Sequence, residues 1–340
     1  MMRAISRVIA AGLVIVVFTF SLFLMRSQTT SAPDFAVAQS VKGLPEITVE
    51  IPQGATGSQI AAILAQSGVV KSAEAYFRVA VGDARAQKVA PGSHRLTVGI
   101  SARQALDQLL DPERIPSLIR VAEGAWKSEV QQAFLDYGFT KQQVKSAFSG
   151  LKLPKGFTNS EGLIFPAQYS FPEGTSAQIA AQTMIDRFSD DPQGRKLLQG
   201  TDTYSAQQLL TIASIIQAES TDVDFTKVSR VIYNRLKIGM PLQMDSTVHF
   251  VMQARGDIFL SRKATMLNSA YNTYRKYGLP PGPICSPGSA AIKAALEPMP
   301  GDWLYFITVA PGDTRFTASF DEFSEWKVLY TKNRKAGAFK

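Results

Sequence analysis

The stretch TIASIIQAES, residues Thr211–Ser220, places one acidic residue, Glu219, at the end of an otherwise apolar helical pattern. Residues three, four and seven apart share one face of a helix, so the isoleucines of this stretch line up with Glu219. We expect a carboxylate on that face to be partly buried, and burial raises a carboxyl pKa. A carboxyl group that is still protonated near neutral pH suits a general acid. The position of Glu219 has an alternative interpretation, in which its side chain turns to solvent or caps the next loop.

The composition is that of a folded protein with a basic surface. The 340 residues are enough for two domains, or for one domain with a long insertion, and 45% are hydrophobic and 19% charged. The net charge of +8 favours an anionic partner, although a basic surface with no specific partner gives the same value. The chain has no RNP-type aromatic motif, helix-turn-helix pattern or zinc knuckle, so we expect no nucleic-acid partner.

The sequence gives little support for a metal or cofactor. Cys285 is the single cysteine, so an intrachain disulfide is excluded. His94 and His249 show no ligand spacing, and we interpret both as ordinary structural or surface residues. The chain also has no Walker A or G-x-G-x-x-G stretch. We therefore expect neither a metal nor a cofactor.

An apolar run, Val8–Met25, lies between Arg7 and Arg26. As a helix it would be about 27 Å long, enough to cross a bilayer. A cleaved signal peptide is the alternative, because residues 36–38 resemble a cleavage site, but Arg26 directly after the run favours an uncleaved anchor. Arg3 and Arg7 precede the run, and Arg26 is the only basic residue between it and Lys42, so we expect a single-pass anchor with a cytoplasmic N-terminus and everything from Ser27 onward outside. The predicted segments are a transmembrane anchor at 1–26 and a flexible tether at 27–45.

The body of the chain repeats one pattern, in which a short extended run leads through a Gly, Ser or Thr break into an amphipathic helix. True duplication and the general frequency of strand-turn-helix units explain this weak repeat equally well. The pattern occurs at Ile47–Leu64, His94–Leu110, Leu118–Leu135 and Tyr169–Met184.

The second half mixes helices and strands without a regular alternation, so we predict an α+β fold. We expect helices at 177–188, 206–219, 226–236, 290–296 and 320–332, and strands at 303–309 and 316–318. Between them, Tyr271–Tyr274 (YNTY) is followed by the proline-rich run Gly278–Ile284 (GLPPGPI). Aromatic rings and an amide beside a rigid backbone suit sugar binding, but such loops often only connect elements.

These motifs together resemble the YceG-like endolytic murein transglycosylase family. The resemblance runs from Glu161 to about Lys332 and includes EGLIFPAQY, LLTIASIIQAES, VIYNRLKIGMPLQMDSTV, SAYNTYRKYGLPPGPICSPG and WLYFI, in the family's order. It implies a C-terminal α+β YceG-like catalytic domain at 156–335. Together with the expected anchor, it implies a single-pass protein of the inner (plasma) membrane whose catalytic domain lies in the periplasm. On weaker grounds, Glu46–Leu110 resembles the family's small LysM-like βααβ module, which with its connecting helices gives a domain at 46–155.

The resemblance also implies the site. Glu219 matches the family's catalytic glutamate, and the other matched positions are expected to bind substrate. These are Asn234, Arg235, Gln243, Asp245, Tyr271, Asn272, Thr273, Tyr274 and Glu161.

The sequence departs from the family pattern at a few positions near these motifs. Gln217 stands where the family commonly has Glu, Ala167 where it has Asp, Ser246 where it has Pro, and Arg315 where it has His. None replaces Glu219, so the departures concern the surroundings of the site.

The implied reaction is cleavage of the MurNAc–GlcNAc bond within peptidoglycan glycan strands, giving 1,6-anhydro-MurNAc ends and ending or releasing nascent strands. Glycan strands are the expected substrate, and peptidoglycan synthases of the elongation or division machinery are expected partners. Two alternatives remain: a lysozyme-like hydrolase, in which water is the nucleophile, and a non-catalytic peptidoglycan-binding scaffold.

Overall fold

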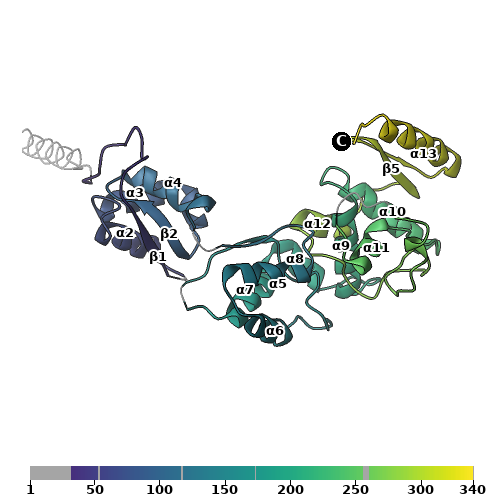
Figure 1. The fold of residues 1–340 in the computed structure, drawn as a ribbon, viewed down its shortest axis with the longest axis horizontal. Helices are drawn as coiled ribbons and strands as arrows, with labels where there is room; N and C mark the ends of the chain where they lie inside the picture. Colours follow the sequence, from purple (N-terminus) through teal and green to yellow (C-terminus); the bar gives the residue numbers. More distant parts are fainter. Residues whose placement is uncertain (1–31, 53, 116–117, 173, 256–259, 340) are drawn as a thin grey trace, which may run out of the picture. The chain divides into compact units, whose positions relative to one another are not determined.

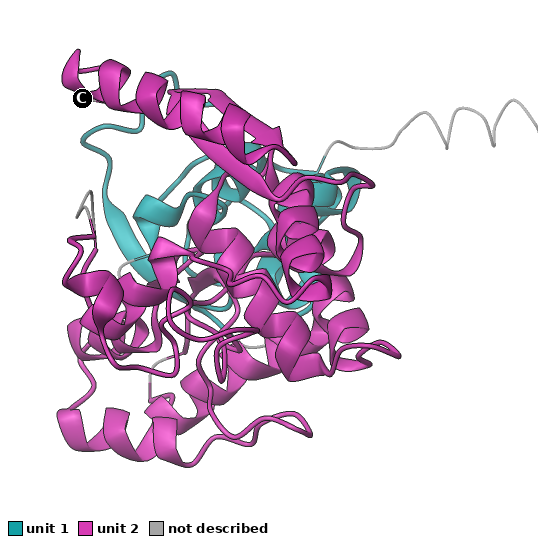
Figure 2. Cartoon of the chain, turned by 90° about the vertical axis from the view of Figure 1, so that its right-hand side faces the viewer, with its two compact units in different colours: residues 1–116 teal, residues 117–340 magenta. Residues whose placement is uncertain are grey.

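The computed structural model describes residues 32–52, 54–115, 118–172, 174–255 and 260–339. The chain divides into two compact units, residues 1–116 and 117–340, which Figure 2 shows in different colours. Each unit has its own hydrophobic core. Every sheet formed by the described residues is a two-stranded antiparallel ribbon, which agrees with the predicted α+β class.

The first unit is a βααβα module. Thr56, Ser72 and Ser101 cap its three α-helices with their side-chain oxygens, as expected for Ser and Thr at these breaks. Leu64, Leu96 and other apolar side chains from both strands and all three helices fill its core. The elements are β1 (Glu46–Ile51), α2 (Gly57–Gln66), α3 (Ala73–Gly82), η1 (Ala84–Lys88), β2 (Gly92–Thr97), α4 (Ala102–Leu109) and η2 (Pro112–Arg114).

The second unit begins with the same element order. Its first elements are β3 (Ile119–Val121), α5 (Lys127–Tyr137), α6 (Lys141–Ser149), β4 (Ala167–Tyr169) and α7 (Ala177–Asp190). The strand pairs of the two copies correspond too. Val49 of β1 lies opposite His94 of β2, and Ile119 of β3 lies opposite Tyr169 of β4.

The turns of the two copies also correspond. Gly54 and Gly124, in the turns after β1 and β3, have φ angles of 73° and 76°, in the left-handed region that favours glycine. Gly68 and Gly138 end α2 and α5, again with positive φ. The weak sequence repeat is therefore a structural repeat.

The rest of the second unit surrounds α9 (Ala206–Glu219), whose residues 209–216 are all buried. Helices α8, α10, α11 and α12 pack against it, and α9, α10 and α12 lie close together in Figure 1. The remaining elements are α8 (Pro192–Leu198), α10 (Phe225–Lys237), α11 (Asp245–Met252), η3 (Ala264–Met266), α12 (Ser289–Leu296), β5 (Tyr305–Ala310), β6 (Asp313–Thr317) and α13 (Phe320–Lys335).

The membrane component of the predicted fold class was wrong for the part of the chain that the structure describes. None of the helices there is both long and apolar enough to cross a membrane. The apolar run Val8–Met25, on which that prediction rested, lies outside the described residues.

Along the sequence, the first compact unit ends at residue 116, whereas the predicted domain boundary lies at 155/156. Helices α5 and α6, which we grouped with the N-terminal module, bury Val130, Phe134 and Val144 in the core of the second unit. The reason is the structural repeat, because α5 and α6 belong to its second copy. The division into functional domains stays a prediction.

Candidate active site

Glu219 is the last residue of α9. A capping box at Ser205 begins this helix, and the fully buried Ile212, Ile215 and Ile216 fix it in the core. The carboxyl group is partly buried, and burial raises its pKa above the ordinary value. The neighbouring Asp245 charge adds to this rise, while hydrogen bonds from Ser246 oppose it.

Ser246, near the start of α11, holds one carboxylate oxygen of Glu219. Its backbone N–H donates to Glu219 Oε1 over 3.1 Å and its hydroxyl donates to the same oxygen over 2.5 Å. Within the described part of the chain, nothing bonds Oε2. A proton on Glu219 therefore belongs on Oε2, the oxygen left to a ligand.

We expect Ser246→Ala to move the alkaline limb of the pH–rate profile to higher pH. The Ser246 hydroxyl stabilises the ionised carboxylate, so its loss raises the Glu219 pKa and extends the acid form upward in pH. Initial rates measured across the pH range give the midpoint. Ser246→Thr keeps the hydroxyl and should keep the wild-type midpoint, and an unchanged midpoint in Ser246→Ala would contradict the assignment.

Glu219 lines a cleft of about 830 Å³ in the second unit. Its polar lining comes from α9, α10, the start of α11 and the loop before α12: Glu219, Arg235, Gln243, Asp245 and Tyr274. Its aromatic lining comes from β5, α13 and the segment after α13: Tyr305, Phe306, Phe320, Phe323, Tyr330 and Phe339. Polar groups beside exposed rings are suited to a sugar chain, whose faces are apolar and whose edges carry hydroxyls.

Asp245 is the other acidic residue of the cleft lining, and it has a partner. The Tyr274 hydroxyl donates to Asp245 Oδ1. Burial, followed by this hydrogen bond, raises the pKa of Tyr274, so the phenol stays protonated and remains the donor. The bond to Tyr274 places Asp245 to orient groups in the cleft, and the raised pKa of Glu219 makes Glu219 the candidate acid.

Arg235 and Asn234 tie α10 to the segments that form the cleft. Arg235 is 6% exposed and donates to the backbone oxygens of Leu242 and Leu304, over 2.5 Å and 2.7 Å. Asn234 uses its amide nitrogen on the backbone oxygens of Gly301 and Trp303, and does not line the cleft. This geometry gives both residues a positioning task.

Gln243 is exposed in the cleft and has a φ angle of 50°, which is uncommon for a residue other than glycine. Its backbone N–H donates to the Thr273 carbonyl oxygen, which holds the conformation in place. Backbone strain of this kind is often found at functional sites.

The remaining predicted site residues lie behind the cleft lining. Asn272 and Thr273 are buried. Asn272 donates to the carbonyls of Thr265 and Leu267 within its own loop, and Thr273 Oγ1 accepts from the Met244 N–H in the segment before α11. The Tyr271 ring packs on Phe250, 5.2 Å away. Of the YNTY motif, only Tyr274 reaches the cleft.

Glu161 is also absent from the cleft lining. It is 6% exposed and accepts a hydrogen bond from the Lys127 N–H at the start of α5. Burial raises the pKa of Glu161 to about 7, although that hydrogen bond works against the rise. The contact joins the EGLIF motif to the start of α5 within the second copy of the repeat.

The proline-rich run packs against α9. Residues 282–288 are buried, the Ile284 N–H donates to Ser214 Oγ, and the Gly288 N–H donates to the side chain of Gln217. Of the two interpretations of this loop, sugar binding and a connection between elements, its burial against α9 favours the structural one.

The departures from the family pattern fall into two groups. Ser246 touches Glu219 directly, and Gln217 holds the loop at Gly288. Ala167 is paired with Val121 between β4 and β3, and the partly buried Arg315 pairs with Asp313 within β6. Only Ser246 acts on the carboxylate itself.

The sequence reasoning missed the aromatic lining of the cleft. Its signal was present in the WLYFI motif and in the ring spacing of the last helix, but these residues read equally well as core. It also noted Ser246 only as a departure. Among the described residues, no group of three or more His, Cys, Asp or Glu could hold a metal ion.

Comparison with known proteins shows the family to which the chain is similar. The YceG-like family model matches residues 49–327. The endolytic murein transglycosylase of Bacillus subtilis (strain 168) is 33% identical over 313 residues, which cover 85% of this chain and 86% of the relative. A protein of the same name from Streptococcus pneumoniae (strain D39) is 29% identical over 180 residues, 52% of this chain and 30% of that relative.

A solved structure agrees with these matches. The crystal structure of a protein described as yceG-like, from Listeria monocytogenes, has 26% identity and a TM-score of 0.57, and the alignment covers 82% of this chain and 98% of that one. Because the family model spans most of the sequence, including Glu219 and the residues around it, this chain belongs to the YceG-like family.

Proposed function

We propose that this chain is an endolytic murein transglycosylase, a lyase that cuts the MurNAc–GlcNAc bond inside peptidoglycan glycan strands. Family membership and the name of the Bacillus subtilis relative support this activity. The observation that carries the mechanism is one partly buried carboxyl group, Glu219, with a raised pKa and a free oxygen in a cleft whose lining includes aromatic rings.

A single carboxyl group is enough for this reaction. Glu219 in its acid form protonates the glycosidic oxygen, so the bond between that oxygen and the anomeric carbon of MurNAc breaks and the GlcNAc side leaves as an alcohol. Glu219, now a carboxylate, takes the proton of the MurNAc C6 hydroxyl. The C6 oxygen attacks the anomeric carbon and closes a 1,6-anhydro ring. Because the nucleophile belongs to the substrate, proximity contributes much of the rate.

Most hydrolytic glycosidases need a second free carboxylate, as nucleophile or base. In this cleft the other carboxylate is Asp245, and it accepts a hydrogen bond from Tyr274. This arrangement favours the transglycosylase over a lysozyme-like hydrolase.

Product analysis tests the proposal. Purified peptidoglycan is digested with the full chain and the fragments are identified by mass spectrometry. We expect ends in 1,6-anhydro-MurNAc, about 18 Da lighter than hydrolysed ends because no water is added, and early fragments of many lengths, as cutting within strands requires. Reducing ends would identify a hydrolase, and intact strands bound to the protein would identify a scaffold.

We also infer the surroundings of the reaction from its substrate. Glycan strands lie outside the cytoplasm, so the catalytic unit acts there. The LysM-like βααβ module of the first unit is proposed to hold the same strands, and peptidoglycan synthases are proposed partners because they deliver nascent strands. Crosslinking in growing cells, followed by identification of the crosslinked proteins, tests this partnership, and recovery of no synthase would argue against it.

A further inference from the structure

Helix α13 presents a regular stripe of side chains to the cleft that contains Glu219. The members of this stripe, Phe320, Phe323, Lys327, Tyr330 and Arg334, all line the cleft. They follow one another at spacings of three or four residues, which keeps them on one helix face. The stripe is about 21 Å long at the usual rise of an α-helix.

The rings of the stripe are not used to build a core. No residue of α13 is fully buried, and Phe320 is 61% exposed. Phe323 stacks on Tyr305 of β5, with ring centroids 5.1 Å apart and an interplanar angle of 22°. Tyr330 packs edge-on against Phe339 at 5.4 Å. Two aromatic pairs therefore remain open to the cleft, where exposed apolar surface indicates a binding site.

From Phe323 onward, aromatic and cationic residues alternate along the stripe. Phe323 and Tyr330 lie two helical turns apart, about 10 Å, and so do Lys327 and Arg334. Two linked pyranose rings have a similar length. The stripe thus offers two rings about one disaccharide apart, with Lys327 between them, to a strand that runs along α13.

Lys327 gives the stripe its charge specificity. Its amine lies 5.7 Å from the centre of the Phe323 ring, and no carboxylate within the described ranges forms an ion pair with it. The amine is therefore available to a substrate anion. MurNAc carries carboxylates that GlcNAc lacks, either on its lactyl group or on the attached peptide.

We propose that the α13 stripe is the glycan-binding wall of the cleft, with Phe323 and Tyr305 stacking on a sugar ring and Lys327 binding a MurNAc-borne carboxylate. This assignment rests on the proposed function and adds to it the residues that select an anionic, MurNAc-containing strand. Lys327 and its neighbours then bind the strand on the cleft side of α13 and hold the cleavable bond at Glu219.

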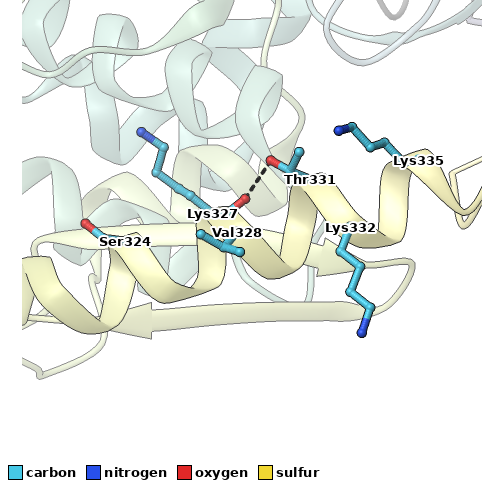
Figure 3. Close-up of a pocket in the computed structure, with 6 residues that line it drawn as sticks. All are labelled: Ser324, Lys327, Val328, Thr331, Lys332 and Lys335. Carbon is cyan, nitrogen blue, oxygen red and sulfur yellow. Dashed lines mark hydrogen bonds between the residues drawn. The ribbon is translucent and has the colours of Figure 1, made fainter.

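A neighbouring face of α13, which shares Lys327 with the stripe, provides a control. Figure 3 shows a shallow hollow formed by Ser324, Lys327, Val328, Thr331, Lys332 and Lys335, with the Lys332 amine pointing away from that of Lys327. Among the described residues only α13 itself lines this hollow, and Lys332 does not line the cleft. Lys332→Ala removes the same charge from the same helix without touching the stripe.

The test compares Phe323→Ala, Phe323→Leu, Lys327→Ala and Lys332→Ala with the wild type, on peptide-bearing glycan strands and on strands stripped of peptide. Release of anhydro ends gives kcat and KM. We expect both Phe323 variants to raise KM about tenfold, as for a central aromatic contact, and Lys327→Ala to raise it about two- to fivefold at low salt, less at high salt. kcat should change little, and Lys332→Ala should behave as wild type.

The outcomes distinguish a failure of the stripe assignment from a failure of the proposed function. If the wild type releases anhydro ends but no stripe variant changes KM, the stripe assignment is overturned while the function stands. If the wild type releases none, the function itself fails. The lactyl carboxylate is free only after the peptide has been removed, so a Lys327 effect on stripped strands alone identifies it, and an effect on peptide-bearing strands alone identifies a peptide carboxylate. An effect on both shows that Lys327 binds whichever carboxylate the MurNAc unit carries. Phe323→Leu keeps apolar packing on Tyr305, so a KM change shared by both Phe323 variants reports the lost ring.

Discussion

Glu219→Gln is expected to reduce strand cleavage to background while leaving the fold intact. Glutamine keeps the size and shape of the side chain, and its oxygen can still accept both hydrogen bonds from Ser246. It can neither give a proton to the leaving oxygen nor take one from the C6 hydroxyl. General acid–base catalysis contributes roughly 10²–10⁴-fold for each transfer, and Glu219 performs both. Release of anhydro ends, measured beside a thermal denaturation curve, checks the prediction.

Asp245→Asn is the matched control for this experiment. Asp245 lines the same cleft and accepts from Tyr274, a bond that an asparagine oxygen also accepts. We therefore expect a clearly milder loss. Wild-type rates in Glu219→Gln would show that the acid has been misassigned, and Asp245, the other acidic residue of the cleft lining, would then be the candidate.

The Glu219 carboxyl group also determines how the wild-type rate changes with pH. Burial raises the Glu219 pKa, so the acid form persists to higher pH than for an exposed glutamate and is lost as pH rises further. We expect the rate to fall on the alkaline side of that pKa. A rate that stays constant from acid to alkaline pH, with chemistry rate-limiting, would contradict this.

Helices with clear local signals were predictable from the sequence. Helix α9 spans the predicted residues 206–219 because Ser205 caps it and its apolar residues recur at helical spacing. Helix α11 was not predicted, since Thr247, Val248 and Val251 are β-branched and its first turn has no side-chain cap. Burial of Thr247 and Val248 stabilises it, and that packing depends on contacts distant in sequence.

The site was predictable only as a set of motifs. Pattern matching groups Asn272 and Thr273 with Tyr274, but the first two are buried, with Asn272 bonded to its own loop and Thr273 to the segment before α11. Likewise, Phe320 and Phe323 look like the apolar face of a terminal helix until the cleft beside them is known. Which member of a motif meets the substrate is decided by tertiary packing, which sequence spacing does not record.

Arg235→Ala is expected to cause the second large effect, on stability and activity together. The guanidinium donates to the backbone oxygens of Leu242 and Leu304. Leu242 precedes Gln243 and Asp245 of the polar lining, and Leu304 leads into β5. The guanidinium therefore connects the polar and aromatic linings of the cleft. Its loss leaves two carbonyl oxygens without their charged donor, at a cost of about 3–5 kcal/mol in the free energy of unfolding.

The activity loss follows from position, because Arg235 need not touch the reacting atoms. A shift of about 1 Å between Glu219 and the strand can reduce the rate roughly 10²-fold. Urea denaturation and initial rates measure the two effects. Lys237→Ala, an exposed residue of the same helix, should change stability by less than about 0.5 kcal/mol. Arg235→Lys should fall between the two, since an ammonium cannot reproduce the fork geometry that reaches both carbonyls. Normal stability in Arg235→Ala would show that the two linings hold together without this residue.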